Sequence, residues 1–547
     1  MKHCIGINLL TRDEILAVVV RALRLVPYYY RNQLPPPELR LEFSDGWLVP
    51  QVGFLFEEPS SRTIGTLREA AVRAGFRCSN PITPETSSLK KGEPPTRATI
   101  TAIQQQNRMM CYRTTVEGYA TQAALYLERE SSRFPEWFRE TPIINGGDGR
   151  QNHPTQVLLD MVTIVAHALG MTSNNEIGVA RLESSLTQLT DDDLAEFITN
   201  HFDNLKIALV GDLRNSRVTN SWLDLGRHFK IQYLLVAPDS FQVEAWRCQG
   251  LRVAVSDKLD DAVAYNVVYT IRTQIERLGN VMTIADAEAI LSAIQVNRRF
   301  IDKSEALIMD AQPLDVLRPM IDPAIWNESQ VIMDIQAIMG SPTRTAVFQM
   351  CWGHRKQHMD LLTIPKSFPY DVLASEEIHS HWQKMQERWQ AEQRAINPLD
   401  KGMVLDRITA GFGLMVDAVI NRAGVHGGLG SSSIIAQRQR STEMGRKDIV
   451  FLPDAFVSED VLAALTLLVG SLRVIELKES LYRKLMFRPP TAVARIFICP
   501  NEACVTRIDP EAESFLHVNS YDGKTSFDCA YCRHRFSTGQ IVSAIHA

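Results

Sequence analysis

KIALVGD (206–212) is a short apolar run that is followed by a helix-like stretch from Ser216 to Phe229 and then by IQYLLVAP (231–238), a second apolar run. The series continues with RVAV (252–255), NVVYTIR (266–272) and EALIMDA (305–311). Apolar strands that alternate with helices predict a parallel sheet that is covered on both faces. The earlier run VGFLF (52–56) opens another such set, so we expect two doubly wound α/β halves facing a cleft. Ligands bind these sheets at the carboxyl ends of their strands.

The amino-acid pattern of the chain changes twice after these halves. Residues 374–396 are charged and rich in Gln, Glu and Trp, which indicates a mostly solvated helix that joins two parts. From about 399, short strand-like runs flank the helical SEDVLAALTLLV (458–469), as in a small α+β domain. We therefore expect α/β halves at 1–160 and 161–365, a helical linker at 366–398, an α+β domain at 399–490 and a small all-β domain at 491–547.

The composition is that of an ordinary globular chain, with 45% hydrophobic and 22% charged residues among 547. Lys and Arg number 58 against 63 Asp and Glu, and the net charge of −5 argues against bulk binding of nucleic acid or of an anionic membrane. No apolar run approaches the roughly 20 residues that a membrane span needs. The start MKHCIGINLLTRDEIL acquires charge too early for a signal peptide, so we expect a cytoplasmic protein.

Four of the nine cysteines gather near the end of the chain, as Cys499-x4-Cys504 and Cys529-x2-Cys532. Two such pairs suit tetrahedral Zn²⁺, and the strand-forming SFLHVNS between them is typical of a zinc ribbon. Four thiolate ligands leave no open coordination position, so we expect a structural metal. Four unrelated buried thiols, or a redox pair at Cys529 and Cys532, are the alternatives.

The first candidate for anion binding is Ser60-Ser61-Arg62-Thr63, which follows VGFLF and begins an amphipathic helix. A serine cap, free backbone N–H groups at the positive end of a helix and a guanidinium together suit a phosphate. An ordinary capped helix with a surface arginine is the alternative.

His153 and Gln156 stand at a second helix start, because proline is favoured in a first helical turn and Pro154 follows a Gly-rich loop. A neutral imidazole there would donate a hydrogen bond to a carbonyl oxygen, and a capping histidine is the alternative. Further polar side chains fall in loops or near strand ends: Ser87, Lys91, Arg113, Arg217, Arg272 and Gln274. Together they place anion-binding groups on both halves, and no Ser-His-Asp set, catalytic metal motif or nucleotide P-loop competes with them.

In combination these segments resemble aspartate carbamoyltransferase. SSRT (60–63), SLKKGE (88–93), HPTQ (153–156), GDLRNSRV (211–218) and IRTQIERL (271–278) occur in that family's order. Beyond 398 the chain resembles the family's separate regulatory chain, through STEMGRKDIVFL (441–452), FVSED (456–460), ICPNEACV (498–505) and CAYCRHRF (529–536). The chain therefore resembles a natural fusion of catalytic and regulatory polypeptides, with a nucleotide-binding-like domain at 399–490 and a zinc ribbon after it.

The resemblance implies transfer of the carbamoyl group of carbamoyl phosphate to L-aspartate, giving N-carbamoyl-L-aspartate and phosphate in de novo pyrimidine biosynthesis. The expected phosphate ligands are Ser60, Ser61, Arg62 and Thr63. Arg113, His153 and Gln156 would grip the carbonyl and amino ends of carbamoyl phosphate. Arg62, Lys91, Arg113 and His153 are the expected catalytic groups.

The second substrate and the assembly follow from the same resemblance. Arg217, Arg272 and Gln274 would bind the two carboxylates of L-aspartate. Ser87 and Lys91 would reach in from a neighbouring subunit, which requires a catalytic trimer and so a homo-oligomer. Two other functions are open: a carbamoyltransferase for a different acceptor such as ornithine, and a non-catalytic assembly protein on the same fold.

Several positions depart from the family's pattern. Ser61 stands where the family carries Thr, and Ile64 stands where it carries a second arginine. The family's His-Pro-Leu-Pro segment appears here as Asp310-Ala311-Gln312-Pro313. These changes alter the expected lining of the substrate site.

The regulatory part departs further. Asp406 and Lys484 match positions that contact nucleotide effectors in the family, whereas Phe451 replaces a lysine contact. Binding of nucleotides is therefore an open expectation. The glycine-rich GVHGGLGSSS (424–433) is expected to be a flexible connection, because no strand precedes it and no lysine follows in the register of a phosphate loop.

Overall fold

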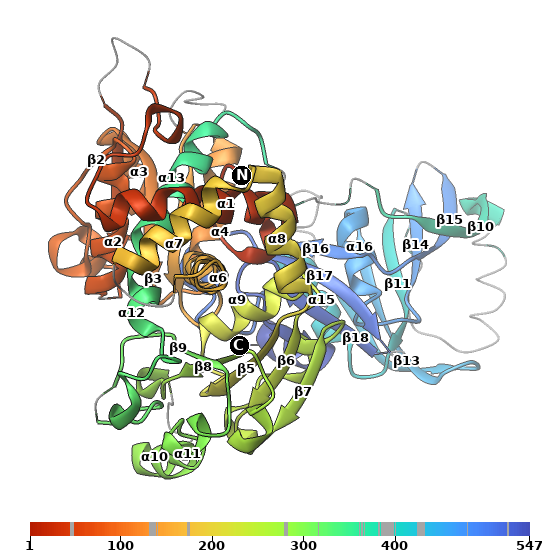
Figure 1. Ribbon diagram of the computed structural model, residues 1–547. Helices are drawn as coiled ribbons and strands as arrows, with labels where there is room; N and C mark the ends of the chain where they lie inside the picture. The colour runs from red at the N-terminus through yellow and green to blue at the C-terminus, as the bar shows by residue number, and fades with distance from the viewer. Residues whose placement is uncertain are drawn as a thin grey trace. The chain divides into compact units, whose positions relative to one another are not determined.

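A computed structural model of the chain divides into two compact units, Met1–Met359 and Asp360–Ala547 (Figure 1). It describes all residues except 44–48, 59, 131–137, 139, 172–175, 278–282, 316, 360, 363–364, 366, 381–382, 384–398, 400, 424–432, 479, 522–523 and 547. Among the described residues no helix is long and apolar enough to cross a membrane.

The first sheet of unit 1 is parallel and has the strand order β2-β1-β3-β4. Its strands are β1 (Gln51–Phe56), β2 (Arg77–Cys78), β3 (Asn107–Thr114) and β4 (Ile143–Asp148). Helices α2 (Ser61–Arg73), α3 (Pro95–Gln104) and α4 (Tyr119–Glu130) lie between them in sequence. The order of the strands reverses between β1 and β3, which is where ligands bind in such sheets.

The second sheet is also parallel, with the order β7-β6-β5-β8-β9 (Figure 1). Its strands are β5 (Lys206–Gly211), β6 (Gln232–Val236), β7 (Arg252–Ser256), β8 (Val267–Ile271) and β9 (Leu307–Asp310). They correspond to the apolar runs in the sequence at 206–212, 231–238, 252–255, 266–272 and 305–311. Helix α9 (Arg217–Leu225) follows β5, and α10 (Ile284–Ser292) and α11 (Arg298–Ile301) precede β9. Here the order reverses between β5 and β8. Both parallel halves of the expected fold class are confirmed.

Long helices join the two halves of unit 1. Helix α1 (Arg12–Tyr30) packs against α6 (Pro154–Ala168), α7 (Glu176–Thr187), α8 (Asp191–Asp203) and α13 (Gly340–Gly353), and α12 (Met333–Ile338) contacts both α6 and α13. Thr11 and Glu14 form a capping box that starts α1, which satisfies two backbone N–H groups at that end. The apolar side chains of these helices and of both sheets form one continuous core, so the two sheets are held by a shared support.

Unit 2 contains the expected α+β domain. Its antiparallel sheet has the order β10-β15-β14-β11-β13-β12. The strands are β10 (Tyr370–Glu377), β11 (Gly402–Thr409), β12 (Ile434–Ser441), β13 (Gly445–Pro453), β14 (Arg473–Lys478) and β15 (Leu481–Phe487), with helices α15 (Gly413–Ala423) and α16 (Glu459–Leu465).

A second antiparallel sheet, with the order β16-β17-β18-β19, forms the ribbon. Its strands are β16 (Ala492–Ala494), β17 (Phe515–Tyr521), β18 (Lys524–Cys529) and β19 (Arg535–Ser537). The sequence predicts strands alone here. The structure adds a short helix α17 (Val505–Ile508) and a closing helix α18 (Thr538–His546), whose apolar Ile541 is fully buried.

The helical linker expected at 366–398 is wrong over its first part. Tyr370–Glu377 forms the edge strand β10, which pairs antiparallel with β15 from Tyr370 opposite Phe487 to Glu377 opposite Leu481. Pairing with a distant strand satisfies the backbone of a charged segment that has no apolar helical stripe, and sequence periodicity does not report such a partner. Residues 384–398 and most of the glycine-rich connection (424–432) lie outside the described residues.

Candidate active site and metal centre

A cavity of about 810 Å³ opens in unit 1 at the carboxyl ends of strands from both parallel sheets. Its polar lining comes from loops and helix starts that follow β1, β5, β8 and β9, from the end of β3 and from α6, α12 and α13. The lining residues are Glu58, Ser60, Ser61, Arg62, Thr63, Thr66, Arg113, His153, Gln156, Leu159, Ser216, Arg217, Val218, Arg272, Gln274, Arg277, Ala311, Gln312, Pro313, Gln336, Ala337, Gly340 and Arg344. Ten of the twelve expected catalytic and substrate-binding residues are therefore brought together.

The turn after β1 lies at the N-terminus of α2, as the sequence indicated. The Ser60 side chain caps the helix by accepting a hydrogen bond from the Thr63 backbone N–H, at 3.3 Å, and its hydroxyl donates to Thr63 Oγ1, at 2.9 Å. Arg62 stands in the first helical turn and is exposed on the cavity wall. The positive end of a helix with a guanidinium beside it suits a phosphate group.

Arg113 and His153 form the inner wall. Arg113 Nη1 donates to the Gly146 carbonyl oxygen at 3.1 Å. The backbone N–H of His153 donates to Ser221 Oγ at 2.9 Å, which fixes the residue just before α6. Burial, and then the charges of Arg217 and Arg113, lower the pKa of His153 well below its usual value, so the ring is neutral at neutral pH. A neutral imidazole keeps one N–H donor, and a carbonyl oxygen is a suitable acceptor for it.

The opposite wall carries the second set of arginines. Arg217 begins α9 directly after β5, and Arg272 and Gln274 follow β8. The backbone N–H of Gln274 donates to Asp212 Oδ2 at 3.0 Å, and Asp212 also accepts from Asn215, so one buried carboxyl group ties the two strand ends together. Guanidinium groups at adjoining strand ends suit a ligand with two carboxylates.

Glu58 is a site residue that no sequence pattern indicated. Its carboxylate accepts from Arg217 Nη1 at 2.7 Å and forms ion pairs with Arg113 Nε at 3.4 Å and Arg277 Nη2 at 3.5 Å. Burial by itself would raise the pKa of Glu58, but Arg217 and Arg113 hold it below the usual range. The acid stands directly before the serine turn in FEEPSSRT, yet its partners lie in other segments, so only the folded chain shows the contact.

Arg344 and Gln336 were also missed. Arg344, on α13, is buried and its Nη1 donates to Thr66 Oγ1 at 2.8 Å, while burial lowers its pKa to about 10. Gln336 is on α12. Both come from helices more than 200 residues beyond the serine turn, and no local motif marks them.

Ser87 and Lys91 do not line the cavity of the single chain. The Ser87 hydroxyl donates to the Thr83 carbonyl oxygen at 2.6 Å, and Lys91 ends the exposed 3₁₀ helix η4 (Ser88–Lys91). Their expected role in the site of a neighbouring subunit stays a prediction.

The departures from the family pattern fall into two kinds. Ile64 packs its half-buried side chain against the core of unit 1, so its position is compatible with an apolar residue. Ala311, Gln312 and Pro313, by contrast, line the cavity, with a cis peptide bond between Gln312 and Pro313.

Asp406 on β11 and Lys484 on β15 belong to the antiparallel sheet of unit 2, in which β14 lies between the two strands. Asp406 pairs with the Lys447 ammonium and stands opposite Arg473 in the sheet. Burial, and then the charge of Arg407, lower the pKa of Lys484, with Lys447 and Arg473 acting in the same direction. We call Arg407, Lys447, Arg473 and Lys484 with Asp406 the basic sheet cluster. Phe451 is buried on β13.

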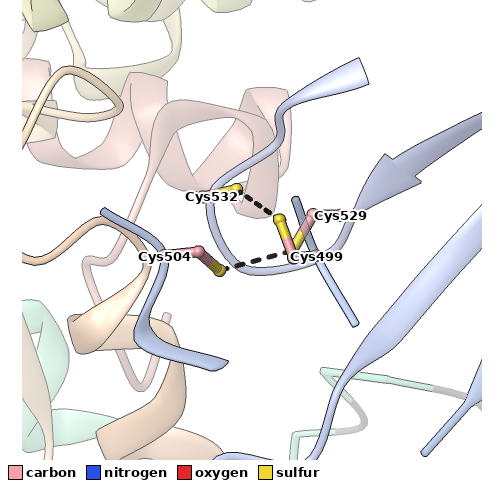
Figure 2. A group of neighbouring side chains, drawn as sticks. All are labelled: Cys499, Cys504, Cys529 and Cys532. Atoms are coloured by element: carbon pink, nitrogen blue, oxygen red, sulfur yellow. Dashed lines mark hydrogen bonds between the residues drawn. The ribbon is translucent and has the colours of Figure 1, made fainter. Parts of the chain in front are cut away.

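The four clustered cysteines form a metal-binding site (Figure 2). Cys499 Sγ lies 3.6 Å from Cys532 Sγ, Cys504 Sγ lies 3.7 Å from Cys529 Sγ, and all four sulfur atoms fall within 4.8 Å of one another. Tetrahedral Zn²⁺ with Zn–S bonds of about 2.3 Å separates its sulfur ligands by about 3.8 Å. Four buried thiols with this spacing, and with no further ligand among the residues that the structure describes, suit structural zinc, as the sequence predicted.

Three models of known protein families match parts of the chain. Residues 2–166 match the carbamoyl-phosphate-binding domain of aspartate and ornithine carbamoyltransferases. Residues 394–482 match the allosteric domain, and residues 491–542 the metal-binding domain, of the aspartate carbamoyltransferase regulatory chain. The chain fuses an aspartate carbamoyltransferase catalytic region to the regulatory region of the same family.

The chain is also similar to individual proteins. The chain is similar to an aspartate carbamoyltransferase catalytic subunit of Brachyspira hyodysenteriae, with 26% identity over 69% of this chain and 90% of that protein. It is 33% identical to one of Aliarcobacter butzleri over 41% of this chain and 60% of that protein. A solved M. jannaschii aspartate transcarbamoylase catalytic subunit is 23% identical, with a TM-score of 0.48 over 64% of this chain and 98% of that one.

Proposed function

We propose that the chain transfers the carbamoyl group of carbamoyl phosphate to the amine of L-aspartate, with N-carbamoyl-L-aspartate and phosphate as products. The observation that carries this proposal is the cavity of unit 1. The N-terminus of α2, which suits a phosphate, and Arg217 and Arg272, which suit a dicarboxylate, line the same space. The family match of residues 2–166 supports the first substrate.

The proposed binding follows the two walls. The phosphate lies at the N-terminus of α2, held by Ser60, Ser61, Arg62 and Thr63. The carbamoyl group points toward Arg113, His153 and Gln156 on the inner wall. L-Aspartate binds Arg217, Arg272 and Gln274 through its carboxylates, so that its amine faces the carbamoyl carbon.

The chemistry needs no protein nucleophile. The neutral amine of aspartate attacks the carbamoyl carbon, a new C–N bond forms, and negative charge grows on the carbonyl oxygen. Neutral His153 donates a hydrogen bond to that oxygen and Arg113 stabilises its charge. Burial and Arg217 lower the pKa of Arg113 to about 9, so it is still protonated at neutral pH. The C–O bond to phosphate then breaks, and the phosphate product carries away the proton that the amine released.

The arginine walls favour aspartate over ornithine. Ornithine brings a cationic side chain, which would face Arg272 and Arg277, whereas Glu58 already pairs with three arginines.

Positioning of the amine against the carbamoyl carbon can supply roughly 7–11 kcal/mol of the catalytic effect.

The test is product formation by the purified full chain with carbamoyl phosphate and either L-aspartate or L-ornithine. We expect carbamoyl aspartate and no citrulline. Formation of citrulline alone would show that the acceptor is ornithine and not aspartate. A folded, zinc-loaded chain that makes neither product would favour the non-catalytic assembly protein.

Assembly and regulation complete the proposal. We propose a homo-oligomer built on a catalytic trimer, in which Ser87 and Lys91 enter a neighbour's cavity. We further propose that the basic sheet cluster binds the phosphates of nucleotide effectors. As a step of pyrimidine biosynthesis, the reaction is proposed to occur in the cytoplasm.

A further inference from the structure

Asp310 is a buried carboxyl group directly beside the cavity. It ends β9, its side chain is only 2% exposed, and the next three residues, Ala311 to Pro313, line the cavity. It stands where the family pattern has histidine, so its role is a property of this chain.

The contacts of Asp310 hold the loop that follows it. Its Oδ1 accepts a hydrogen bond from the Gln312 backbone N–H at 2.6 Å, and its Oδ2 accepts from Thr270 Oγ1 at 2.6 Å. The backbone of Gln312 has a φ of 44°, a left-handed conformation that a residue with a side chain adopts only when its surroundings impose it. The carboxyl group therefore anchors an otherwise unfavourable loop conformation.

A short chain of hydrogen bonds extends from Asp310 to Gln156 on the inner wall. The Asp310 backbone N–H donates to Gln336 Oε1 at 3.3 Å, and Gln336 Nε2 donates to Asp160 Oδ1 at 2.7 Å. The same Asp160 oxygen accepts from Gln156 Nε2 at 3.1 Å. The loop after β9 is thus connected to Gln156, which the proposed function places at the carbamoyl group.

The charge of Asp310 acts on the same space. Burial raises the pKa of its carboxyl group to about 6, although Thr270, the Gln312 backbone, Arg272 and Arg62 all favour the ionised form. Tyr269 on β8 also faces it, and Asp160, whose own pKa burial raises to about 7, is reached through Gln336. The negative charge of an ionised Asp310 offsets part of the attraction that Arg62 and Arg272 exert on an anionic ligand.

We propose that Asp310 is a positioning and affinity-setting residue for the reaction proposed above: its carboxyl group holds the Gln312 loop in register with Gln156, and its negative charge weakens the binding of anionic substrates. The inference rests on the proposed function for its substrates. Because the protonated form binds anions better, affinity is highest below the pKa of Asp310 and falls as the pH rises through it. Bound anions raise that pKa further.

Two substitutions separate the two effects. Asp310→Asn keeps an oxygen that accepts from Gln312 and an amide that donates to Thr270 Oγ1, whose hydroxyl also lies 3.1 Å from the Met309 carbonyl oxygen and can donate there. It removes only the charge. Asp310→Ala removes the anchor as well. Asp203→Asn is a matched control, because Asp203 accepts from Lys230 and Arg12 and does not line the cavity.

The experiment measures kcat and KM for both substrates from pH 5.5 to 8.5. For the native chain we expect KM to rise about threefold to tenfold across this range, since one pKa unit corresponds to a factor of ten. Asp310→Asn should keep kcat within about threefold and hold KM at its low value at pH 8, whereas Asp310→Ala should lose about tenfold or more in kcat/KM. Asp203→Asn should follow the native profile.

Two results would overturn the inference: an Asp310→Asn profile that matches the native one, or an Asp310→Ala variant with native kcat/KM. If Asp310→Ala fails to fold, the Asp310→Asn profile decides. If the native chain shows no turnover, the proposed function fails separately, and binding of inorganic phosphate measured by calorimetry at pH 5.5 and 8 takes over. Asp310→Asn must then bind phosphate more tightly than the native chain at pH 8 but not at pH 5.5, and equal affinities at both values would overturn the inference.

Discussion

Each unit of the chain gathers basic side chains around one carboxylate, but the two clusters are built differently. In unit 1, Arg113, Arg217 and Arg277 surround Glu58 inside a cavity, and they come from strand ends and helix starts. In unit 2, Asp406 pairs with Lys447, stands opposite Arg473 and acts on the charge of Lys484, and these side chains come from strands of one antiparallel sheet. Arg407 of the same cluster pairs with Glu443.

The two clusters differ in how many side chains from separate segments can reach one ligand. Parallel strands end at one edge of a sheet, so loops that are distant in sequence bring several guanidinium groups onto one ligand. Strands of an antiparallel sheet display side chains at fixed spacings. The two lysines of the basic sheet cluster, Lys447 and Lys484, act as point charges, whereas an arginine can donate two parallel hydrogen bonds to one ligand. We therefore expect the unit 1 site to depend sharply on single groups and the unit 2 cluster to respond in small, additive steps.

The largest effect is expected from a substitution that removes the metal from unit 2. Cys499→Ser deletes one of four thiolates, and zinc binding in such sites is worth on the order of 10 kcal/mol. We expect loss of zinc, unfolding of the ribbon and weaker assembly, with the activity of the catalytic trimer retained. Metal analysis and thermal unfolding measure this. Cys78→Ser, a half-buried thiol outside the cluster, is the control and should keep one zinc per chain. Full zinc content in Cys499→Ser would show that the cluster is not the metal site.

The next effect tests the dependence on a single group in unit 1. His153→Ala removes the neutral donor at the carbonyl oxygen and should lower kcat by about 10²–10³-fold with a small change in unfolding. His201→Ala is the matched control, since that ring packs on Phe197 and does not line the cavity. Mixing His153→Ala with an inactive Lys91→Ala variant should restore part of the activity if subunits share sites. Unchanged turnover of His153→Ala would show that His153 does not stabilise the carbonyl oxygen during the reaction.

The smallest effect probes the basic sheet cluster. Lys484→Ala should weaken binding of ATP or CTP about tenfold or less, because one charge-assisted contact is lost while Lys447 and Arg473 remain. The loss should shrink at high salt, since half-exposed charges are screened. Calorimetry checks this, with Lys401→Ala, an exposed lysine of the same unit, as the control. A loss as steep as that of His153→Ala would contradict the additive behaviour expected of a sheet face.

The sequence by itself determined both parallel sheets and the kinds of chemistry. Apolar runs and their alternation with helices predicted both parallel sheets, because buried strands need continuous apolar side chains. The two cysteine pairs predicted the metal site, since ligand spacing is local, and the serine turn and HPTQ segment marked helix starts that line the cavity. Their assigned roles toward substrates remain predictions.

Only the tertiary structure decided which distant groups meet. Glu58 clamps arginines up to 219 residues away, Gln336 bridges to Asp160 across 176 residues, and Arg344 reaches Thr66 across 278. The pairing of β10 with β15 replaced an expected helix for the same reason. Hydrogen bonds and ion pairs between remote segments leave no periodic trace in the sequence, because their geometry exists only after the helices and sheets have packed.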